Sequence, residues 1–445
     1  MSLRLLTWRP TWAPLWPAGL AALLVLGPFF FWSYGLANHH AASLPAVPSV
    51  VFDWEAGVPF LPWTILPYWS IDLFYGLSLL LAPSRATLFT QAARLLTAQC
   101  VCVASFLLWP LRFATPRPAA DGWAQALFDA LSGFDLPYNQ APSLHIVLLL
   151  VLWDFYRRLL PARWLPALHA WSALIGVSVL TTYQHHAIDV PTGLAAGALC
   201  LWLWPWQGQR PWQAWRQEPV RPSLALAWGL AAAACGLAAG LGGAQHRAAW
   251  LLAWPALAFA LVALAYLGLG THAFQKRTHG RPSLAARWLL WPHRLTAWLN
   301  ARAWTRRLPA SVPIHGNVWL GRLPLPWEPD HRRAQAILDL SAELHVAHPG
   351  VHAHPMLDLV APASASLQAA ADQLERLHRA TPGPVLVGCA LGFSRSVAVL
   401  LVWLCRHGHV PHLDAALQQV RQQRPQVVLP PALLHAVQTA LGPTP

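Results

Sequence analysis

Long apolar runs fill most of the first 270 residues of the chain. A bilayer is crossed by about 20 apolar residues in a helix, and eight of the runs approach or reach that length. They span residues 17–37, 62–82, 93–111, 143–160, 164–181, 187–206, 223–243 and 249–270. The pattern therefore predicts a polytopic all-α membrane domain over residues 1–275, with about eight transmembrane helices.

The hydrophobic pattern changes after residue 270. Residues 276–310 mix Trp and Leu with Arg and are broken by Pro292, which predicts a basic amphipathic linker on the inner membrane surface; a ninth span is the alternative. From residue 311 to 445, short apolar runs alternate with helical stretches, as in a cytoplasmic α/β domain. The expected strands are NVWLG, AILDL and PVLVG, and the expected helices include SLQAAADQLERLH and LDAALQQVRQQ.

Composition supports the membrane interpretation. The chain of 445 residues is 56% apolar and 11% charged, so much of the apolar excess is expected to face lipid. The first apolar run is too long for the core of a signal peptide and no small-residue cleavage site follows it, so we interpret it as a retained helix. The 6 cysteines form no disulfide framework.

Basic residues orient the predicted helices. The formal net charge is +13, and 14 Lys or Arg residues near the spans fall on one side against 3 on the other. The positive-inside rule makes the first side cytoplasmic and places both termini there, in the plasma or inner membrane. The charge then reflects topology and attraction to anionic lipids, and no nucleic-acid partner is expected. The 14 are Arg4, Arg9, Arg85, Arg94, Arg157, Arg158, Arg163, Arg210, Arg216, Arg221, Lys276, Arg277, Arg281 and Arg287, and the 3 are Arg112, Arg117 and Arg247.

The stretch VGCALGFSRS, residues 387–396, lies between the expected strand PVLVG and the expected helix SVAVLLVWLCRH. A strand-to-helix turn directs backbone N–H groups and the helix dipole into one hollow, which binds a phosphate dianion and favours a cysteine thiolate. Gly392 relieves the tight turn, Arg395 offers a planar fork to two phosphate oxygens, and Ser396 hydrogen-bonds the sulfur of Cys389 when it leaves. The alternative is a buried structural cysteine followed by a helix-capping arginine.

The Cys-x5-Arg-Ser loop resembles the signature of dual-specificity protein tyrosine phosphatases, over roughly residues 311–445. The resemblance implies a phosphoric monoester hydrolase with Cys389 as nucleophile and an Asp about thirty residues earlier as general acid. Asp358, 31 residues before Cys389, fits that position, and Asp339 is the competitor. The family usually has His before the cysteine, where this chain has Gly388, so the bonds that brace the loop must come from elsewhere.

Three polar clusters interrupt the apolar runs on the side with few arginines: RFATPRP, NQAPSLH and YQHHAID. Ionisable groups within a membrane domain are candidates for function, and loops on one face converge on one pocket. His185 and Asp189 are spaced i, i+4, so the carboxylate holds the imidazole while the other ring nitrogen attacks phosphorus. His145 serves as general acid or base; Ser143, at a helix start, and Arg117 bind phosphate.

These clusters resemble the type 2 phosphatidic acid phosphatase superfamily over roughly residues 60–206, through "RP", "PS-x-H" and "H-x-x-x-D". Two positions depart from the full pattern: Pro110 replaces a Lys and Val179 replaces an Arg. With the HH doublet, these departures look more like the branch of inositol phosphorylceramide and sphingomyelin synthases, which transfers a phosphorylated headgroup to a lipid hydroxyl. The second histidine, His186, is either a substrate-binding or an interfacial residue.

Three hypotheses follow from these constellations. The first is a two-headed membrane enzyme with an outward His-dependent lipid phosphoesterase or phosphotransferase and a cytoplasmic Cys-dependent phosphatase, whose partners are membrane lipids and phosphoprotein or phosphoinositide substrates. The second is a non-enzymatic sensor of phospholipid headgroups with decayed sites, and the third is a proton-relay transporter. Neither phosphatase chemistry requires a metal or another cofactor, and the His-rich HVAHPGVHAHP lacks thiolate partners at ligand spacing.

Overall fold

The computed structural model describes residues 15–243 and 246–442, so Arg4 and Arg9 of the charge count lie outside the described residues. The chain forms two compact units, residues 1–207 and residues 208–445. The boundary between the units falls inside the predicted membrane domain, and the last two apolar runs belong to the second unit. The domain boundaries expected at residues 275 and 310 stay predictions.

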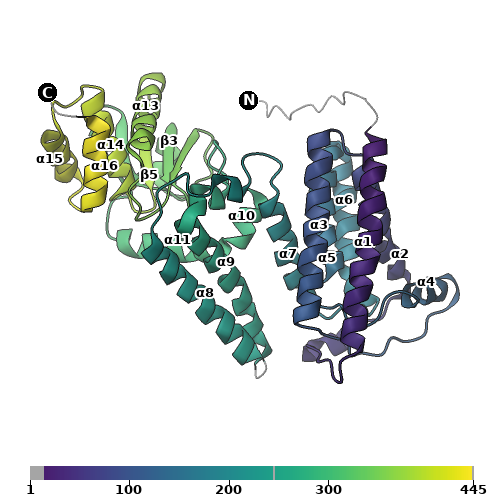
Figure 1. Ribbon diagram of the computed structural model, residues 1–445. Coiled ribbons are helices and arrows are strands. Elements are labelled where there is room, and N and C mark those ends of the chain that lie inside the picture. The colour runs from purple at the N-terminus through teal and green to yellow at the C-terminus, as the bar shows by residue number, and fades with distance from the viewer. Residues whose placement is uncertain (1–14, 244–245, 443–445) are drawn as a thin grey trace. The chain divides into compact units, whose positions relative to one another are not determined.

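The first unit is a helix bundle, drawn in purple to blue-green in Figure 1. Successive long helices run antiparallel, so the loops that follow α1, α3 and α6 lie at the same end of the bundle. The three polar clusters sit in or beside those loops and are therefore brought together, as predicted. The helices are α1 (Trp16–Ala42), α2 (Ile65–Leu80), α3 (Arg85–Leu108), α4 (Gly122–Ser132), α5 (Leu144–Leu159), α6 (Leu165–Thr181) and α7 (Asp189–Leu203).

Five helices of the described chain are long and apolar enough to cross a bilayer. They are α1, α3, Ala162–Thr181, Pro222–Gly243 and Ala248–Phe274. Helices α2, α5 and α7 coincide with predicted windows but have 16, 16 and 15 residues, which is less than the ~20 residues of a full span. The arrangement of eight spans therefore stays a prediction.

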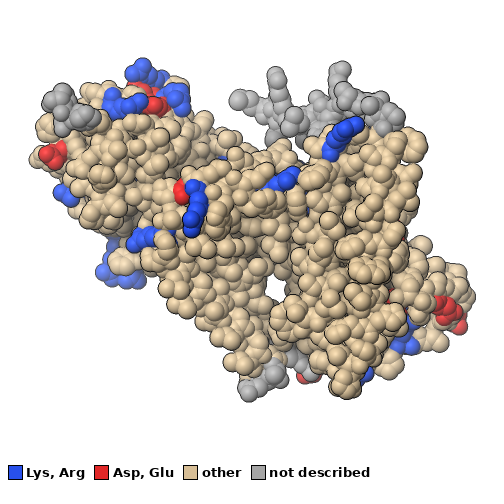
Figure 2. Space-filling model, viewed as in Figure 1, with Lys and Arg blue, Asp and Glu red and all other residues tan. Residues whose placement is uncertain are grey.

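The second unit begins with a helical hairpin. Its elements are η4 (Pro211–Ala214), α8 (Pro222–Gly243), η5 (Arg247–Leu252), α9 (Ala253–Leu264), η6 (Ala265–Leu269) and η7 (Gly270–Phe274). Along α8 a row of leucines is more than 60% exposed: Leu226, Leu230, Leu237 and Leu241. Figure 2 shows almost no charge on the visible face of this hairpin. Such a large apolar surface is typical of a membrane-contacting helix.

A five-stranded sheet forms the centre of the second unit, with strand order β1-β2-β5-β3-β4. The strands are β1 (Ser311–His315), β2 (Val318–Arg322), β3 (Ala336–Ser341), β4 (Val351–Met356) and β5 (Val385–Cys389). Only the β1–β2 pair is antiparallel. Strands β2, β3 and β5 are the three that the sequence predicts, and the two edge strands were not predicted.

Helices cover both faces of this sheet. Along β5, Val385 and Val387 join one hydrophobic cluster and Leu386 joins another, because successive strand residues face opposite sides. The first cluster contains side chains of α13 (Ser364–Ala380), α14 (Arg395–Arg406), α15 (Leu413–Gln423) and α16 (Pro431–Leu441). The second contains Ala301 of α11 (Trp291–Thr305). Burial on both faces explains the continuous apolar runs of β3 and β5.

Residues 276–310, predicted as an amphipathic linker, are folded against the sheet. They contain α10 (Leu284–Leu289) and α11, and the short helix α12 (Pro329–Arg333) follows β2. Lys276 is the only lysine of the chain, and its Nζ lies 2.6 Å from Asp339 Oδ2 in β3, with both side chains fully buried. The backbone N–H of Ala353 in β4 donates to Thr278 O at 2.9 Å. The segment therefore contributes to the core of the α/β fold.

Candidate active sites

The cysteine loop joins β5 to α14, because β5 ends at Cys389 and α14 begins at Arg395. The Cys389 side chain is buried, and its Sγ accepts the Gly392 N–H at 3.2 Å. Ser396 Oγ lies 3.3 Å from the same sulfur. Hydrogen bonds to sulfur stabilise negative charge on it, which is the form that attacks phosphorus.

Gly392 is required by the backbone of this loop. Its φ is +76°, and a Cβ at this position would lie 2.4 Å from the carbonyl carbon of Gly321 in β2. A side chain would therefore push the loop off the sheet and displace the N–H group that donates to Cys389. The sequence-based role of Gly392, relief of a tight turn, matches this geometry.

Arg395 is held by a carboxylate that sequence reasoning missed. Its two terminal nitrogens donate to Glu343 Oε2 at 2.9 Å and Oε1 at 2.7 Å, and one of them also donates to Met356 O at 2.9 Å. Burial raises the pKa of Glu343, but the Arg395 pair outweighs burial and lowers that pKa to about 2. Arg395 Nε is buried without a hydrogen-bond partner among the described residues, which leaves a donor for an anion.

Asp358 lies beside Arg395. It follows β4, and its Oδ1 is 3.0 Å from a terminal nitrogen of Arg395, while a third of its side chain is exposed. Burial raises the pKa of Asp358, and the Arg395 charge partly offsets that rise. A carboxyl group that keeps its proton to higher pH is suited to donate it to a leaving oxygen. Asp339, the competitor, is fully buried and paired with Lys276.

The cysteine loop is braced by backbone contacts and by one buried arginine. Arg424 donates from Nη2 to Leu391 O at 3.1 Å and from Nη1 to Pro309 O at 3.2 Å. The N–H of Leu323 donates to Cys389 O at 3.0 Å, and Val428 N–H donates to Phe393 O at 2.9 Å. These bonds brace a loop that has Gly388 where the resembled family has histidine.

The second site lies in the helix bundle. His185 Nδ1 is 3.1 Å from Asp189 Oδ2, and the same carboxylate oxygen accepts the His186 N–H at 3.0 Å. Asp189 engages Nδ1 of His185, which leaves Nε2 as the ring nitrogen that does not contact this carboxylate. The i, i+4 pair therefore has the geometry that the sequence predicts.

His145 and Ser143 stand at the start of α5, next to this pair. The His145 ring stacks on Tyr68 at 3.8 Å, its centroid is 6.3 Å from that of His185, and its Nε2 has no partner among the described residues. Ser143 Oγ caps α5 by accepting the Ile146 N–H, and Ser143 N–H donates to Asp189 O at 3.1 Å. The side chain of Ser143 is thus already engaged as a helix cap.

Close packing of α7 on α5 creates this neighbourhood. A Cβ on Gly193 would lie 2.7 Å from Ile146 Cβ and 2.9 Å from Ser143 O, so only glycine permits the approach. The two helix starts, which carry Ser143 and Asp189, are consequently in contact. Sequence reasoning did not consider Gly193.

His186 differs from His185 because both of its ring nitrogens are engaged. Its Nδ1 is 2.8 Å from Glu55 Oε2, and its Nε2 accepts the Ala114 N–H at 3.0 Å. The ring also stacks on Phe113 with centroids 4.3 Å apart. These contacts assign His186 to holding the loops together, so the interfacial alternative fits better than substrate binding.

Arg117 and His185 line one cavity of about 460 Å³. Arg117 donates to Ser132 Oγ at 3.0 Å and lies over the Phe128 ring. The same cavity is lined by Asp135, which sequence reasoning missed and which accepts the Tyr34 hydroxyl at 2.9 Å. This cavity therefore brings together a cation, an imidazole and a carboxylate from separate loops.

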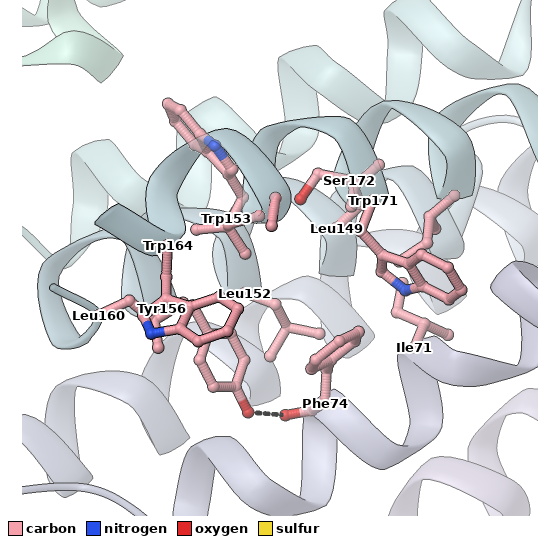
Figure 3. Close-up of a pocket in the computed structure, with 13 residues that line it drawn as sticks. Ile71, Phe74, Leu149, Leu152, Trp153, Tyr156, Leu160, Trp164, Trp171 and Ser172 are labelled. Atoms are coloured by element: carbon pink, nitrogen blue, oxygen red, sulfur yellow. Dashed lines mark hydrogen bonds between the residues drawn. The ribbon is translucent and has the colours of Figure 1, made fainter. Parts of the chain in front are cut away.

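A further cavity of about 230 Å³ lies among α2, α5 and α6 (Figure 3). Its lining is almost wholly apolar and includes Trp153, Trp164 and Trp171, and the Tyr156 hydroxyl there donates to Phe74 O at 2.8 Å. None of the predicted catalytic residues lines it. Of the predicted site residues of the bundle, His185 and Arg117 line the larger cavity instead.

No family model matches the chain, and no curated protein matches it. Solved structures match about 30% of it. Tk-PTP in its active form has 25% identity, with 97% of that chain covered and a TM-score of 0.26. Human DUSP28 has 25% identity over 93% of its chain and a TM-score of 0.26, and PTPMT1 in complex with PI(5)P has 18% identity over 95% and a TM-score of 0.27.

Proposed function

We propose that the chain is a two-headed integral membrane enzyme, with a Cys-dependent phosphatase in the second unit and a His-dependent lipid phosphoesterase or phosphotransferase in the first. The observation that carries the proposal is the cysteine loop, in which Cys389 Sγ accepts the Gly392 N–H while Arg395 keeps an unpartnered Nε among the described residues and pairs with Asp358. Cys389, Arg395 and Asp358 supply a nucleophile, an anion donor and a proton donor.

The cysteine site performs two displacements. In the first, the Cys389 thiolate forms a bond to phosphorus as the ester P–O bond breaks, and Asp358 gives its proton to the departing oxygen. In the second, water attacks phosphorus, Asp358 takes a proton from that water, and the S–P bond breaks to release phosphate. The free Arg395 Nε–H donates to a phosphoryl oxygen in both steps, and the Ser396 hydroxyl stabilises the leaving thiolate.

Activity of the full chain tests this first head. In a His185→Ala background, the detergent-solubilised protein should hydrolyse para-nitrophenyl phosphate and be inhibited by vanadate. Cys389→Ser should abolish the activity because a serine hydroxyl is hardly ionised at neutral pH. Cys405→Ser is the matched control, because Cys405 lies in α14 and outside the cysteine loop. This variant should retain the phosphatase activity. Equal activity of the two variants would contradict the proposal.

The His185–Asp189 pair supports the second head. We infer that His185 Nε2 attacks the phosphorus of a phospholipid, so that an N–P bond forms as the P–O bond to the lipid breaks, and His145 protonates the departing oxygen. Water in a hydrolase, or a lipid hydroxyl in a transferase, then attacks phosphorus, His145 takes its proton, and the N–P bond breaks to release His185. Asp189 positions the imidazole, and Arg117 balances phosphate charge.

Trapping with a radiolabelled phospholipid tests the second head. In a Cys389→Ser background, acid quenching should destroy a covalent label that alkali preserves, as expected for a phosphohistidine. His185→Ala should carry no label, whereas His169→Ala, an exposed histidine on α6, should carry it normally. Label retained on His185→Ala would refute the assignment.

The proposed topology places both termini in the cytoplasm and the His185 cavity on the outer side of the membrane. An alkaline phosphatase fusion after residue 445 should therefore be inactive in a bacterial host, because that enzyme requires export. An active fusion would reverse the orientation and put Cys389 in an oxidising compartment.

A further inference from the structure

The loop that carries Asp358 is hydrogen-bonded to the chain at both the start and the end of the apolar hairpin, residues 222–274. The Tyr266 hydroxyl, in the last part of the candidate span Ala248–Phe274, donates to Asp358 O at 3.2 Å. The Arg221 guanidinium, just before α8, donates to Leu359 O. The hairpin and the α/β fold belong to one compact unit. The general-acid loop therefore lies at the end of two helices that can cross a bilayer.

This attachment is itself well fixed. Arg221 N–H donates to Tyr266 O at 2.9 Å, and Arg216 N–H donates to Gly268 O at 2.7 Å. The Glu218 carboxylate accepts the N–H and the hydroxyl of Thr271 at 2.9 and 2.5 Å. These bonds join the chain before α8 to the chain after α9, so the contacts to Asp358 and Leu359 come from a rigid base of the hairpin.

The surface next to Asp358 has the character of a membrane interface. Leu359 is 59% exposed and has a left-handed backbone with φ of +56°, so an apolar side chain is presented to the exterior at a conformation that leucine rarely adopts. Exposed arginines lie in the two chain segments that precede and follow the hairpin, and such charges attract anionic headgroups. They are Arg216, Arg221, Arg277, Arg281 and Arg287.

We propose that the cysteine site acts on phosphomonoesters carried by lipid headgroups in the same bilayer that holds the hairpin. This inference rests on the proposed Cys389 phosphatase and names its substrate class. A phosphorylated protein reaches a site from solution and gains nothing from an acid loop fixed to membrane helices. A lipid phosphate is confined to the plane in which Arg221 and Leu359 lie, and that confinement raises its local concentration.

The test compares one headgroup presented in three ways. The full chain with His185→Ala is placed in nanodiscs, and phosphate release is measured from dioleoyl phosphatidylinositol 4-phosphate in the same disc. Two further arms supply that lipid in separate vesicles or as a water-soluble dibutanoyl form. We expect the same-disc rate to exceed both by about a hundredfold, and Cys389→Ser to remove it.

Two substitutions of Leu359 provide a second test. Leu359→Asn suits the left-handed backbone and removes the apolar side chain, so we expect about tenfold slower turnover of the lipid in the disc and an unchanged rate with para-nitrophenyl phosphate. Leu359→Met keeps an apolar side chain and is the matched control, with little change expected on either substrate.

The outcomes separate this inference from the proposed function. Equal rates in all three arms, or a phosphotyrosyl peptide turned over faster than the lipid in the disc, would overturn the inference while Cys389-dependent hydrolysis of para-nitrophenyl phosphate stands. Loss of the lipid preference in Leu359→Asn but not in Leu359→Met would support it. If Cys389→Ser left hydrolysis of para-nitrophenyl phosphate intact, the proposed function itself would fail.

Discussion

Replacing Lys276 by methionine should destabilise the α/β fold more than most single substitutions. The Lys276 ammonium lies 2.6 Å from Asp339 Oδ2 and also donates to Leu344 O at 2.7 Å and to Ser341 O, with no exposed side-chain surface. Lys276→Met leaves a buried carboxylate and two carbonyls without their cation. Breaking a buried ion pair in this way costs about 3–5 kcal/mol.

The assay is thermal inactivation of aryl phosphatase activity in the full chain. For a unit of this size, 1 kcal/mol corresponds to about 2–4 °C, so the midpoint should fall by about 6–20 °C. Adding Asp339→Leu removes the unpaired buried carboxylate. The double variant should recover much of the lost thermal midpoint, because an apolar pair often replaces a buried ion pair without penalty. A midpoint within about 2 °C of the parent, or no recovery in the double variant, would refute the reasoning.

Three further predictions concern the two sites. Asp358→Asn should slow alkyl phosphates by about a hundredfold or more but para-nitrophenyl phosphate only slightly, and it should remove the alkaline limb of the rate profile, since activity falls as pH rises through the raised pKa of Asp358. Glu343 has a lowered pKa, so the ionised carboxylate stabilises the fold by about 3 kcal/mol above pH 4.5. This stabilisation is lost as the pH falls toward 2. The unfolding free energies of Glu343→Gln and of its parent should therefore converge as the pH is lowered over that range. His186→Ala should lower the stability of the bundle, but His185 should still accept the phospholipid label. Loss of the label in His186→Ala would instead identify His186 as the nucleophile.

The cysteine loop could be predicted because its parts are close in sequence. Cys389, Gly392 and Arg395 lie within one strand-to-helix turn, and the apolar runs on either side identify β5 and α14. The same applies to His185 and Asp189, which are one helical turn apart. Patterns of this kind encode local geometry, and the structure places these residues as expected.

Partners from distant segments could not be predicted. Glu343 meets Arg395 across 52 residues, and nothing in the sequence around Glu343 distinguishes it from other acidic residues. The edge strands were missed because SVPIH and VHAHPM contain proline and polar positions, which weaken the strand pattern and are tolerated at sheet edges. The linker expected over residues 276–310 has an amphipathic composition, but its apolar face packs on the sheet as well as on the hairpin.

Gly388, which departs from the phosphatase pattern, packs against Leu323, the residue that follows β2. A Cβ on Gly388 would lie 2.9 Å from Leu323 Cδ2, so a histidine at this position would require the Leu323 side chain to shift. Arg424 instead holds the loop from its other side through Leu391 O, and its guanidinium is almost fully buried. Because the loop is braced at both ends, the departure from the family pattern does not by itself indicate a decayed site, which favours the enzyme over the headgroup sensor.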